Sequence, residues 1–451
     1  MTDRIQMTDI SRTKPSHPIT ALGLLVTLGI VFGDIGTSPL YVMKTICHAN
    51  PAFDADYILG AVSLVFWTLT LQTTVKYVLI ALRADNRGEG GILALYSLVK
   101  SKGKGWLYLL AALGAATLIA DGVITPAITV TTSVEGLSAI MPDPPVIPVT
   151  LLIITLIFAA QRFGTSAIGR CFGPFMLIWF LMLGVLGACN IGLSPSILKA
   201  FNPWYAVKIL VDYPGWFLVL GAVFLCTTGA EALYSDLGHC GRWNISLSWL
   251  FVKAMLVLNY LGQGAWIIAH PSEAAAGDIN PFYAIMPGWF LMIGIVMSAG
   301  ASIIASQALI SGSFTIFSEA MNLNFWPRLK IKYPTTVKGQ LYIPSVNLFL
   351  YAGCMLTVLI FGSSAHMEGA YGLAITITML TTTMLLAFWM KQRKTPTWLV
   401  WTFFAVFAGI EGIFLCANLF KFIHGGWYTL LISLALAVSY THLRAHETSL
   451  H

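Results

Sequence analysis

A lone carboxylate interrupts the first apolar run of the chain. Residues 21–32 are apolar, but Asp34 arrives well before the roughly 20 residues that a spanning helix needs. Glycine, proline, serine and threonine crowd positions 33–41, and glycine and proline weaken the regular hydrogen bonding of a helix. Loose backbone at membrane depth is tolerated only where it faces protein or a watery cavity. An acid at such a break indicates a functional site, and the stretch 30–41 predicts an oxygen-lined cation site inside a transporter.

A second carboxylate shares a helix face with two hydroxyl groups. Asp121, Thr125 and Thr129 recur every four residues, a spacing that places side chains on one face of a helix. Their oxygens are hard ligands, of the type that suits alkali and alkaline-earth cations. The alternative is structural: the threonine hydroxyls bond back to carbonyls four residues earlier, and Asp121 pairs with a base near the membrane surface.

A third carboxylate lies beside Thr228. Glu231 follows Thr228 by three positions, so a helical backbone places the two side chains together. No basic residue is close to Glu231 in sequence, and an isolated charge at the bilayer centre costs at least ~2.5–3.5 kcal/mol. The carboxyl group can bind a proton instead, as a proton-coupled carrier requires. We expect Glu231 to carry the coupling proton, with Asp121 as the second candidate; the alternative is a structural, hydrogen-bonded carboxyl group.

The composition places these acids in a membrane. Hydrophobic residues make up 57% of the 451 residues and charged residues only 10%, against about 25% charged residues in soluble domains. The net charge of +6 does not indicate nucleic-acid binding, because the basic residues fall in short loops between apolar segments. The seven cysteines form no CxxC pair, and we interpret most of them as small buried hydrophobes. No signal-peptide cleavage site is evident.

Helices that span a membrane have to position the acids. Twelve apolar runs approach the length of a span. They are 20–43, 57–82, 107–138, 145–161, 168–192, 215–237, 246–269, 287–317, 342–361, 367–390, 397–419 and 426–440. The sequence therefore predicts an all-α polytopic membrane protein with about twelve transmembrane helices.

The basic residues predict the orientation of these spans. With a cytoplasmic N-terminus, most Lys and Arg fall in cytoplasmic segments, and the outer segments hold only Lys44, Lys199, Lys208 and Lys421. This asymmetry is the positive-inside pattern. We expect both termini to be cytoplasmic.

An internal echo predicts a repeat. The segment 36–41, GTSPLY, resembles 229–234, GAEALY, in spacing and in its ending, and each interrupts an apolar run beside an acid. Interrupted helices at spans 1 and 6 are typical of five-plus-five inverted repeats, in which the substrate binds near the midplane between the two breaks.

Further charged residues lie in or near the spans. Lys76 and Lys253 could extend to the membrane surface or neutralise carboxylates, but the sequence does not assign their partners. We interpret Glu135 and Asp236 as paired or solvated acids toward opposite ends of the spans, and Glu411 also lies in a span.

A glycine-rich loop, 83–91, joins the second apolar run to the next segment. Its glycines suggest a tight turn or close packing against another helix. It lacks the GxxxxGK[ST] pattern of a phosphate-binding loop, so we predict a structural or gating role.

Four segments resemble the signature segments of the KUP/HAK/KT potassium uptake permeases. In the family's order they are 33–41 (GDIGTSPLY), 83–91 (RADNRGEGG), 120–128 (ADGVITPAI) and 134–137 (VEGL). The run 227–239 also resembles the family's sixth helix, and the similarity extends from about residue 20 to 438. Several long motifs in one chain make a chance match improbable.

The resemblance implies twelve spans in the amino-acid–polyamine–organocation superfamily fold, and potassium uptake coupled to protons. It implies potassium ligands from helices 1, 3 and 6. By matching position the cation path is lined by Asp34, Tyr41, Asp121, Thr125, Thr129, Thr228 and Glu231. Tyr41 and the identity of the ion come from the resemblance alone.

The resemblance also implies the cellular location of the chain and its partners. We expect a multi-pass protein of the bacterial inner (plasma) membrane, with potassium, protons and the lipid bilayer as partners and a homodimer as its assembly. No cofactor is expected beyond the transported potassium ion and proton. We predict a cytoplasmic tail at 1–19, a transmembrane domain at 20–438 and a short non-native or truncated tail at 439–451, because family members continue into a cytoplasmic C-terminal domain.

Three other function classes were weighed. An amino-acid or amine carrier of the same superfamily would need an apolar pocket for a side chain, whereas the crowding of acids and hydroxyls favours a small bare ion. A potassium channel would use repeated TVGYG-type filters, which the sequence lacks. An intramembrane enzyme is disfavoured because no HExxH or nucleophile–base pairing stands out.

Overall fold

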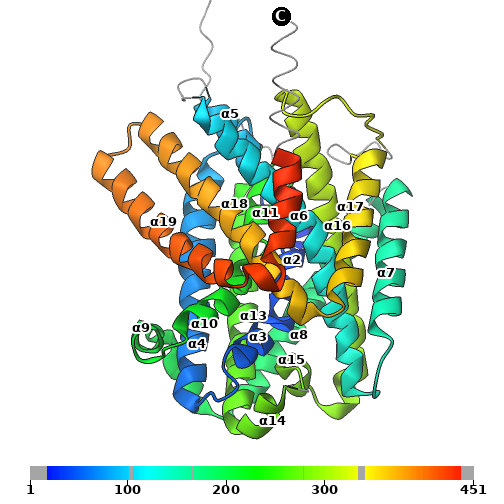
Figure 1. The fold of residues 1–451 in the computed structure, drawn as a ribbon, viewed down its shortest axis with the longest axis vertical. Coiled ribbons are helices and arrows are strands. Elements are labelled where there is room, and N and C mark those ends of the chain that lie inside the picture. The colour runs from blue at the N-terminus through cyan, green and yellow to red at the C-terminus, as the bar shows by residue number, and fades with distance from the viewer. Residues whose placement is uncertain (1–17, 101–104, 164–165, 278, 334–340, 438–451) are drawn as a thin grey trace, which may run out of the picture.

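The computed structural model describes residues 18–100, 105–163, 166–277, 279–333 and 341–437, and these fold almost entirely into helices (Figure 1). In this part of the chain, nine helices are long and apolar enough to cross a membrane, and a bent pair near the N-terminus forms a tenth span. Two shorter apolar helices, α7 (Val146–Ala160) and Trp427–Ala437, occupy the remaining expected positions. The all-α polytopic prediction is confirmed, while the number of twelve spans stays a prediction.

The long helices follow the predicted apolar runs closely. The second span is α4 (Ala55–Thr68), which continues into a π-helical segment, η2 (Leu69–Ile80). The other long helices are α6 (Trp106–Glu135), α8 (Ser166–Ile191), α13 (Arg242–Ala269), α16 (Gly288–Asn322), α17 (Pro344–Phe361), α18 (Ser364–Gln392) and α19 (Thr397–Phe420). Apolar periodicity and length therefore locate the spans from sequence.

The third span, α6, lies at the centre of the bundle. The most apolar part of Trp106–Ala139 is 83% buried inside the protein, the largest share among the candidate spans of the described chain. α6 packs against α16, α17 and α18. Because its surroundings are protein rather than lipid, the polar stripe of this helix can be satisfied internally.

The first span breaks within the predicted stretch 30–41. α1 (Ala21–Ile30) and the helical segment Gly33–Leu40 are bent by 67° at Val31 and Phe32. A Cβ added at Gly33 would lie 3.0 Å from the Cα of Ala305, so the chain turns where it meets the backbone of α16. The break therefore lies before Gly36, the first residue of the repeated segment.

The sixth span breaks at Thr228 and Gly229. α10 (Trp216–Val223) and the 3₁₀ turn η7 (Phe224–Thr227) lead into it, and α11 (Ala230–Ser235) follows it. Thr228 has an extended ψ of 141°, and Gly229 adopts a left-handed φ of 84°, which glycine tolerates best. Both spans that the internal echo singled out are thus interrupted.

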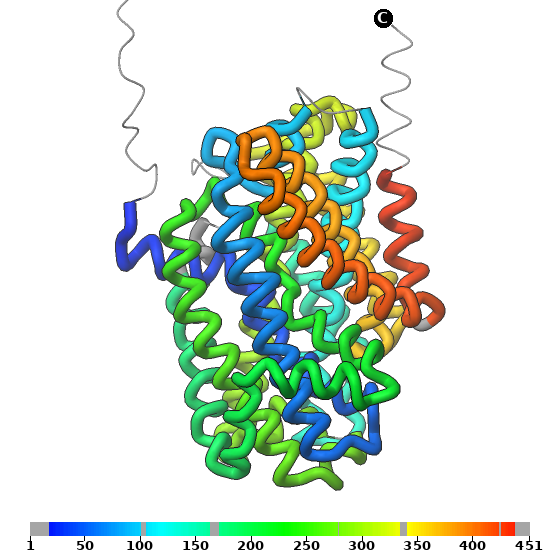
Figure 2. The backbone as a smooth tube through the Cα atoms, turned by 90° about the vertical axis from the view of Figure 1, so that its left-hand side faces the viewer, coloured from blue at the N-terminus to red at the C-terminus, as the bar shows by residue number. Residues whose placement is uncertain are grey.

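The two ends of the bundle differ in their connections. α5 (Ile92–Val99) marks one end, and α14 (Pro271–Ala276) and α15 (Pro281–Ala284) mark the other (Figure 1). α18 and α19 pack against each other, and the orange part of the tube runs obliquely across the outside of the bundle (Figure 2). Large apolar side chains such as Leu152, Val185 and Leu250 stay exposed, as lipid-facing surfaces require.

Candidate cation site between two helix breaks

The two helix breaks contact each other. A Cβ added at Gly229 would lie 2.8 Å from the backbone nitrogen of Ile35 and 3.1 Å from Oδ2 of Asp34. Only a residue without a side chain permits this approach, and its left-handed φ requires glycine for the same reason. The repeated segments, far apart in sequence, therefore build one location.

A cluster of hydroxyl groups joins the breaks. The Ser38 and Thr228 hydroxyls lie 2.8 Å apart, and the Tyr41 hydroxyl is 3.0 Å from that of Thr228. The Thr228 hydroxyl also lies 3.0 Å from the carbonyl of Leu225, to which it can donate. Ser38, Tyr41 and Thr228 are fully buried. Thr228 is the shared member of this cluster, and Tyr41, which entered only through the family resemblance, is one of its partners.

Asp34 is held from the opposite side by a tyrosine. The Tyr371 hydroxyl of α18 donates to Oδ1 of Asp34 at 3.2 Å, and the rings of Tyr371 and Tyr41 meet edge to face with centroids 6.1 Å apart. Tyr371 also interacts with Thr125. A residue that the sequence did not single out thus connects the first break to α6.

Asp121 and Thr125 face the same region from α6. The Thr125 hydroxyl donates to Oδ1 of Asp121 at 2.7 Å, and Asp121 lies close enough to Asp34 for the two acids to interact electrostatically. Thr129 differs, because its hydroxyl donates to the backbone carbonyl of Thr125 at 2.7 Å. That is the back-bonding which the structural alternative described, although the lone pairs of the Thr129 oxygen stay available.

Glu231 forms a neighbouring subgroup. Its Oε1 accepts hydrogen bonds from the Thr382 hydroxyl of α18, at 2.7 Å, and from the Tyr77 hydroxyl of η2. Glu231 is buried and interacts electrostatically with Asp121. Tyr41 and Thr228 are thus in direct contact, Asp121 bonds Thr125, and Asp34 and Glu231 keep separate hydrogen-bond partners. Thr129 bonds only to Thr125 among the predicted residues.

Each break contributes one carboxylate oxygen without a partner. Asp34 Oδ2 and Glu231 Oε2 are both buried and make no hydrogen bond within the described residues. In the same part of the chain, no three His, Cys, Asp or Glu side chains are grouped to hold a metal ion. The oxygens in this region come from carboxylates and hydroxyls, which are hard ligands of the type that suits alkali and alkaline-earth cations.

Lys76 forms an ion pair with Glu411, a partner that the sequence does not assign. Its ammonium group lies 2.6 Å from Oε1 of Glu411, and both side chains are fully buried. Lys253 instead donates to the hydroxyls of Thr70 and Thr74, at 3.0 and 3.2 Å, so it neutralises no carboxylate. The interpretation that Lys76 neutralises an acid is correct, and that acid is Glu411.

Glu135 and Asp236, which we interpreted as paired or solvated acids, both lie beside a basic residue. Glu135 contacts Lys44 at 3.3 Å and accepts from the backbone nitrogen and hydroxyl of Ser364 at 2.8 and 2.6 Å, so it caps the start of α18. Asp236 lies 3.4 Å from Nδ1 of His239. Neither contributes to the location where the breaks meet.

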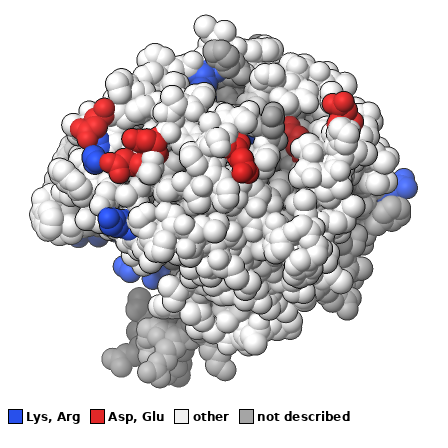
Figure 3. Space-filling view, turned by 90° about the horizontal axis from the view of Figure 1, so that it is seen from below, with Lys and Arg blue, Asp and Glu red and all other residues white. Residues whose placement is uncertain are grey.

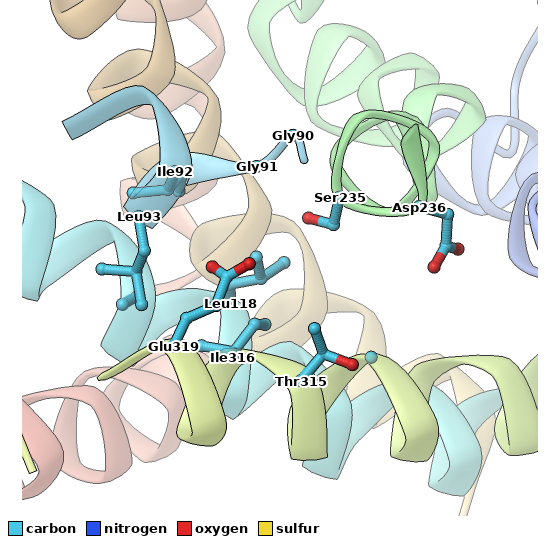
Figure 4. A pocket seen from close by; sticks show the side chains of 12 residues that line it. Gly90, Gly91, Ile92, Leu93, Leu118, Ser235, Asp236, Thr315, Ile316 and Glu319 are labelled. Atoms are coloured by element: carbon cyan, nitrogen blue, oxygen red, sulfur yellow. The ribbon is translucent and has the colours of Figure 1, made fainter. Parts of the chain in front are cut away.

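A pocket lies beneath the loop 83–91 at the end marked by α5. Gly90, Ser235 and Glu319 are among its lining residues, and Figure 4 shows the Glu319 carboxylate rising from α16 toward the loop. The Tyr234 hydroxyl donates to the carbonyl of Ala84 at 2.6 Å, and the Tyr234 carbonyl packs directly on Gly90. The loop thus rests on the helix that follows the second break, which favours the predicted structural or gating role.

Sequence reasoning missed the tyrosines and threonines that hold the acids. Tyr371, Tyr77 and Thr382 come from α18 and η2, which neither contain a break nor carry the repeated segment. Their only signal is a polar group within an apolar run, which also describes many structural residues. The charged residue Lys76 inside a span is the one sequence signal that could have drawn attention to its neighbour Tyr77.

Known proteins resemble this chain over most of its length. A family model described as "K+ potassium transporter integral membrane domain" matches residues 21–447. The "Probable potassium transport system protein Kup" of Flavobacterium psychrophilum is 54% identical over 418 residues, which cover 92% of this chain and 64% of that protein. The proteins of the same name from Cytophaga hutchinsonii and Lacticaseibacillus casei are 53% and 52% identical. They cover 95% of this chain, which spans 66% and 65% of their lengths.

The fold has a relative among solved structures. A crystal structure of the Eremococcus coleocola manganese transporter, in complex with an aromatic bis-isothiourea compound, superposes with a TM-score of 0.52 and 12% identity. The match covers 98% of each chain. At this identity the likeness shows the fold alone.

The family and its relatives are described by potassium transport and not by catalysis, so the comparisons place the chain among transporters and not enzymes. The match extends from the start of the first span to beyond the last described helix. This chain belongs to the KUP/HAK/KT family of potassium transporters.

Proposed function

We propose that this chain takes up potassium ions and that potassium binds where the two helix breaks meet. The observation that carries the proposal is the pair of buried carboxylate oxygens, Asp34 Oδ2 and Glu231 Oε2, without partners among the described residues. A buried acceptor without a partner is costly, and a bound cation supplies the missing interaction. The names of the relatives supply the identity of the ion.

The proposed ligands combine carboxylate and hydroxyl oxygens. They are Asp34, Tyr41, Asp121, Thr125, Thr129, Thr228 and Glu231, as the family resemblance implies, with Tyr371 added because its hydroxyl contacts Asp34. Potassium is recognised elsewhere by uncharged oxygens that replace its hydration shell. The hydroxyls at the breaks offer such oxygens, and Asp34 supplies the compensating charge.

Uptake is proposed to be coupled to protons through Glu231, with Asp121 as the second candidate. Glu231 binds the hydroxyls of Tyr77 and Thr382 through one oxygen, which leaves its other oxygen free for a proton or for the cation. Because the two broken spans touch at Gly229, their relative movement would change the distance between Asp34 and Glu231. We further propose a multi-pass location in the bacterial inner membrane with both termini cytoplasmic.

The test is rubidium uptake by cells that lack their own potassium transporters. Asp34→Asn should reduce uptake at low external rubidium at least tenfold, because the amide removes the charge that compensates the cation. Glu231→Gln should lose accumulation driven by an inward proton gradient in proteoliposomes, because an amide does not carry the proton, and it should also weaken rubidium binding, because Glu231 is a proposed ligand. Unlabelled potassium should compete with rubidium, whereas amino acids should not.

Exposed acids provide matched controls. Asp143→Asn and Glu273→Gln make the same carboxylate-to-amide changes at exposed positions, and they should leave uptake within twofold of the unchanged chain. Wild-type uptake by both Asp34→Asn and Glu231→Gln would refute the assignment of the site. Competition by amino acids would favour the amino-acid carrier instead.

A further inference from the structure

A continuous line of buried polar groups leads away from the candidate site. Tyr77 donates its hydroxyl proton to Oε1 of Glu231. The same hydroxyl accepts from the ammonium group of Lys76 at 3.2 Å. Lys76 in turn lies 2.6 Å from Oε1 of Glu411 on α19. The line therefore connects the acid of the second break with the outermost pair of helices, through two consecutive residues of η2.

Every hydrogen-bond donor of Lys76 has an acceptor. The ammonium group donates to Glu411 Oε1 at 2.6 Å, to the carbonyl of Met379 at 2.8 Å and to the Tyr77 hydroxyl at 3.2 Å. An ammonium group carries three donors, so it is fully satisfied here. A buried charge with complete partners and an adjacent counter-charge has one favoured geometry, and it fixes the position of the groups it touches.

The two glutamates in this line differ in one respect. Glu411 has both oxygens bound, by Lys76 and by the Thr383 hydroxyl at 2.7 Å. Glu231 has only Oε1 bound, and Oε2 has no partner in the described part of the chain. Both oxygens of Glu411 are thus bound within the protein, while one oxygen of Glu231 has no hydrogen-bond partner among the described residues.

α18 holds the two carboxylates through neighbouring residues. Thr382 donates to Glu231, Thr383 donates to Glu411, and the carbonyl of Met379 lies one turn earlier on the same helix. η2 has π-helical hydrogen bonding from Leu69 to Ile80, a form often found at functional sites. The groups that surround the Tyr77 hydroxyl and its Lys76 neighbour therefore come from η2, α11, α18 and α19.

We propose that Lys76 and Glu411 are positioning residues that hold the Tyr77 hydroxyl against Glu231 and thereby turn the free Glu231 oxygen toward the cation. The inference rests on the proposed potassium uptake. In this role the ion pair does not touch the ion, and its effect reaches the ion through Tyr77 and Glu231. A purely structural ion pair would instead only join η2 to α19.

The test measures rubidium uptake against concentration in proteoliposomes, corrected for the amount of reconstituted protein. Tyr77→Phe removes the donor to Glu231 and leaves the ring in place. The double variant Lys76→Met with Glu411→Gln removes the ion pair without leaving one charge buried alone. Both should raise the half-saturation concentration about tenfold, equivalent to about 1.4 kcal/mol, with the maximal rate within twofold.

The combined variant separates positioning from stability. If Lys76 and Glu411 act through Tyr77, adding Tyr77→Phe to the double variant should raise the half-saturation concentration no further. Tyr351→Phe removes a hydroxyl whose partner is Thr155 near the protein surface, and as the matched control it should leave half-saturation unchanged. If the Met variant does not reconstitute, Lys76→Gln with Glu411→Gln keeps polar groups at both positions and has the same expected result.

The outcomes distinguish a failure of this inference from a failure of the proposed function. An unchanged half-saturation in Tyr77→Phe, or in the double variant, would overturn the inference while potassium uptake stands. A further additive rise in the combined variant would show an independent ion pair and would equally overturn it. A failure of the unchanged chain to take up rubidium would reject the proposed function, and the inference with it.

Discussion

Tyrosine hydroxyls hold both acids at the helix breaks. Tyr371 donates to Asp34, and Tyr77 donates to Glu231, each from a helix outside the pair that is broken. Both tyrosines are fully buried. A tyrosine places a hydrogen-bond donor at the end of a rigid ring, so it fixes the carboxylate orientation with little conformational freedom of its own. The direction of the free carboxylate oxygens is therefore set by residues that need not contact the cation through a charge.

Removal of the Tyr371 hydroxyl should weaken cation binding without unfolding the chain. In Tyr371→Phe, Asp34 loses its donor, and Oδ1 as well as Oδ2 is left without a partner among the described residues. We expect the half-saturation concentration for rubidium to change by a factor of about 5–30, equivalent to 1–2 kcal/mol. Tyr333→Phe, at a residue 69% exposed, is the control and should match the unchanged chain.

At the residue scale, the acids were predictable and their partners were not. Asp34, Asp121 and Glu231 stand out because a charge in an apolar run needs a reason to be there. Tyr371 and Tyr77 do not, because tyrosine is common in membrane spans and its partner depends on which helices pack together. The role of Thr129 stays a prediction: its spacing matches a ligand face, and its hydroxyl donates to the Thr125 carbonyl while the lone pairs of its oxygen stay available.

At the scale of elements, the break in the sixth span depends on a single glycine. Gly229 combines a left-handed φ of 84° with close contact to the backbone of Ile35. Either condition alone excludes most side chains. The contact also means that the two breaks cannot separate or approach without changing the surroundings of Asp34.

Gly229→Ala should destabilise the chain and reduce uptake. The new methyl group would lie 2.8 Å from the Ile35 nitrogen, and the left-handed backbone adds about 1–2 kcal/mol of strain. We expect a lower melting temperature in detergent and at least tenfold slower rubidium uptake. Gly409→Ala on α19, where an added Cβ meets nothing within 4 Å, should leave both measurements unchanged or slightly improved. Equal behaviour of the two variants would contradict the packing argument.

The elements themselves were largely visible in the sequence, because apolar length and periodicity determine where a helix can span. The exact break in the first span was not: it lies at Val31 and Phe32, just before Gly33 packs on the backbone of α16, and not at the glycine of the repeated segment. Gly33 and Ala305, which meet there, are more than 250 residues apart in sequence (305 − 33). Local glycine and proline content identifies the region but not the residue.

At the scale of the whole molecule, the expected orientation rests on the basic residues of the connections between spans. Figure 3 looks onto the end that carries α14, and it shows both acidic and basic side chains scattered over a mostly uncharged face. Arg328, Lys330 and Lys332 lie in the exposed connection between α16 and α17. The positive-inside pattern predicts that this connection is cytoplasmic.

Single cysteines can test that orientation in intact cells. In a chain with its own seven cysteines replaced, Asp143→Cys should react with a membrane-impermeant maleimide, because residue 143 is exposed in a connection expected outside. Lys332→Cys is equally exposed but expected to be cytoplasmic, so it should react only after the membrane is permeabilised. Reversed labelling would show that the predicted orientation is wrong.

The sequence could predict the membrane class and the family at this scale, because both follow from composition and long motifs. The number of spans and the tails at the two ends of the chain are not decided by the described residues. α7 and Trp427–Ala437 are shorter than a full span, and residues 1–17 and 438–451 lie outside the described residues. The predicted tails at 1–19 and 439–451, the twelve spans and the homodimer therefore stay predictions.

The two partnerless carboxylate oxygens have a practical consequence for handling the protein. Anything that binds only the folded state stabilises it by mass action, by about 2.7 kcal/mol when the ligand is at a hundred times its dissociation constant. Potassium that satisfies Asp34 Oδ2 and Glu231 Oε2 would therefore act as a folding ligand as well as cargo. Extraction and storage in potassium salts, and not in large organic cations, should prolong the lifetime of the folded chain in detergent.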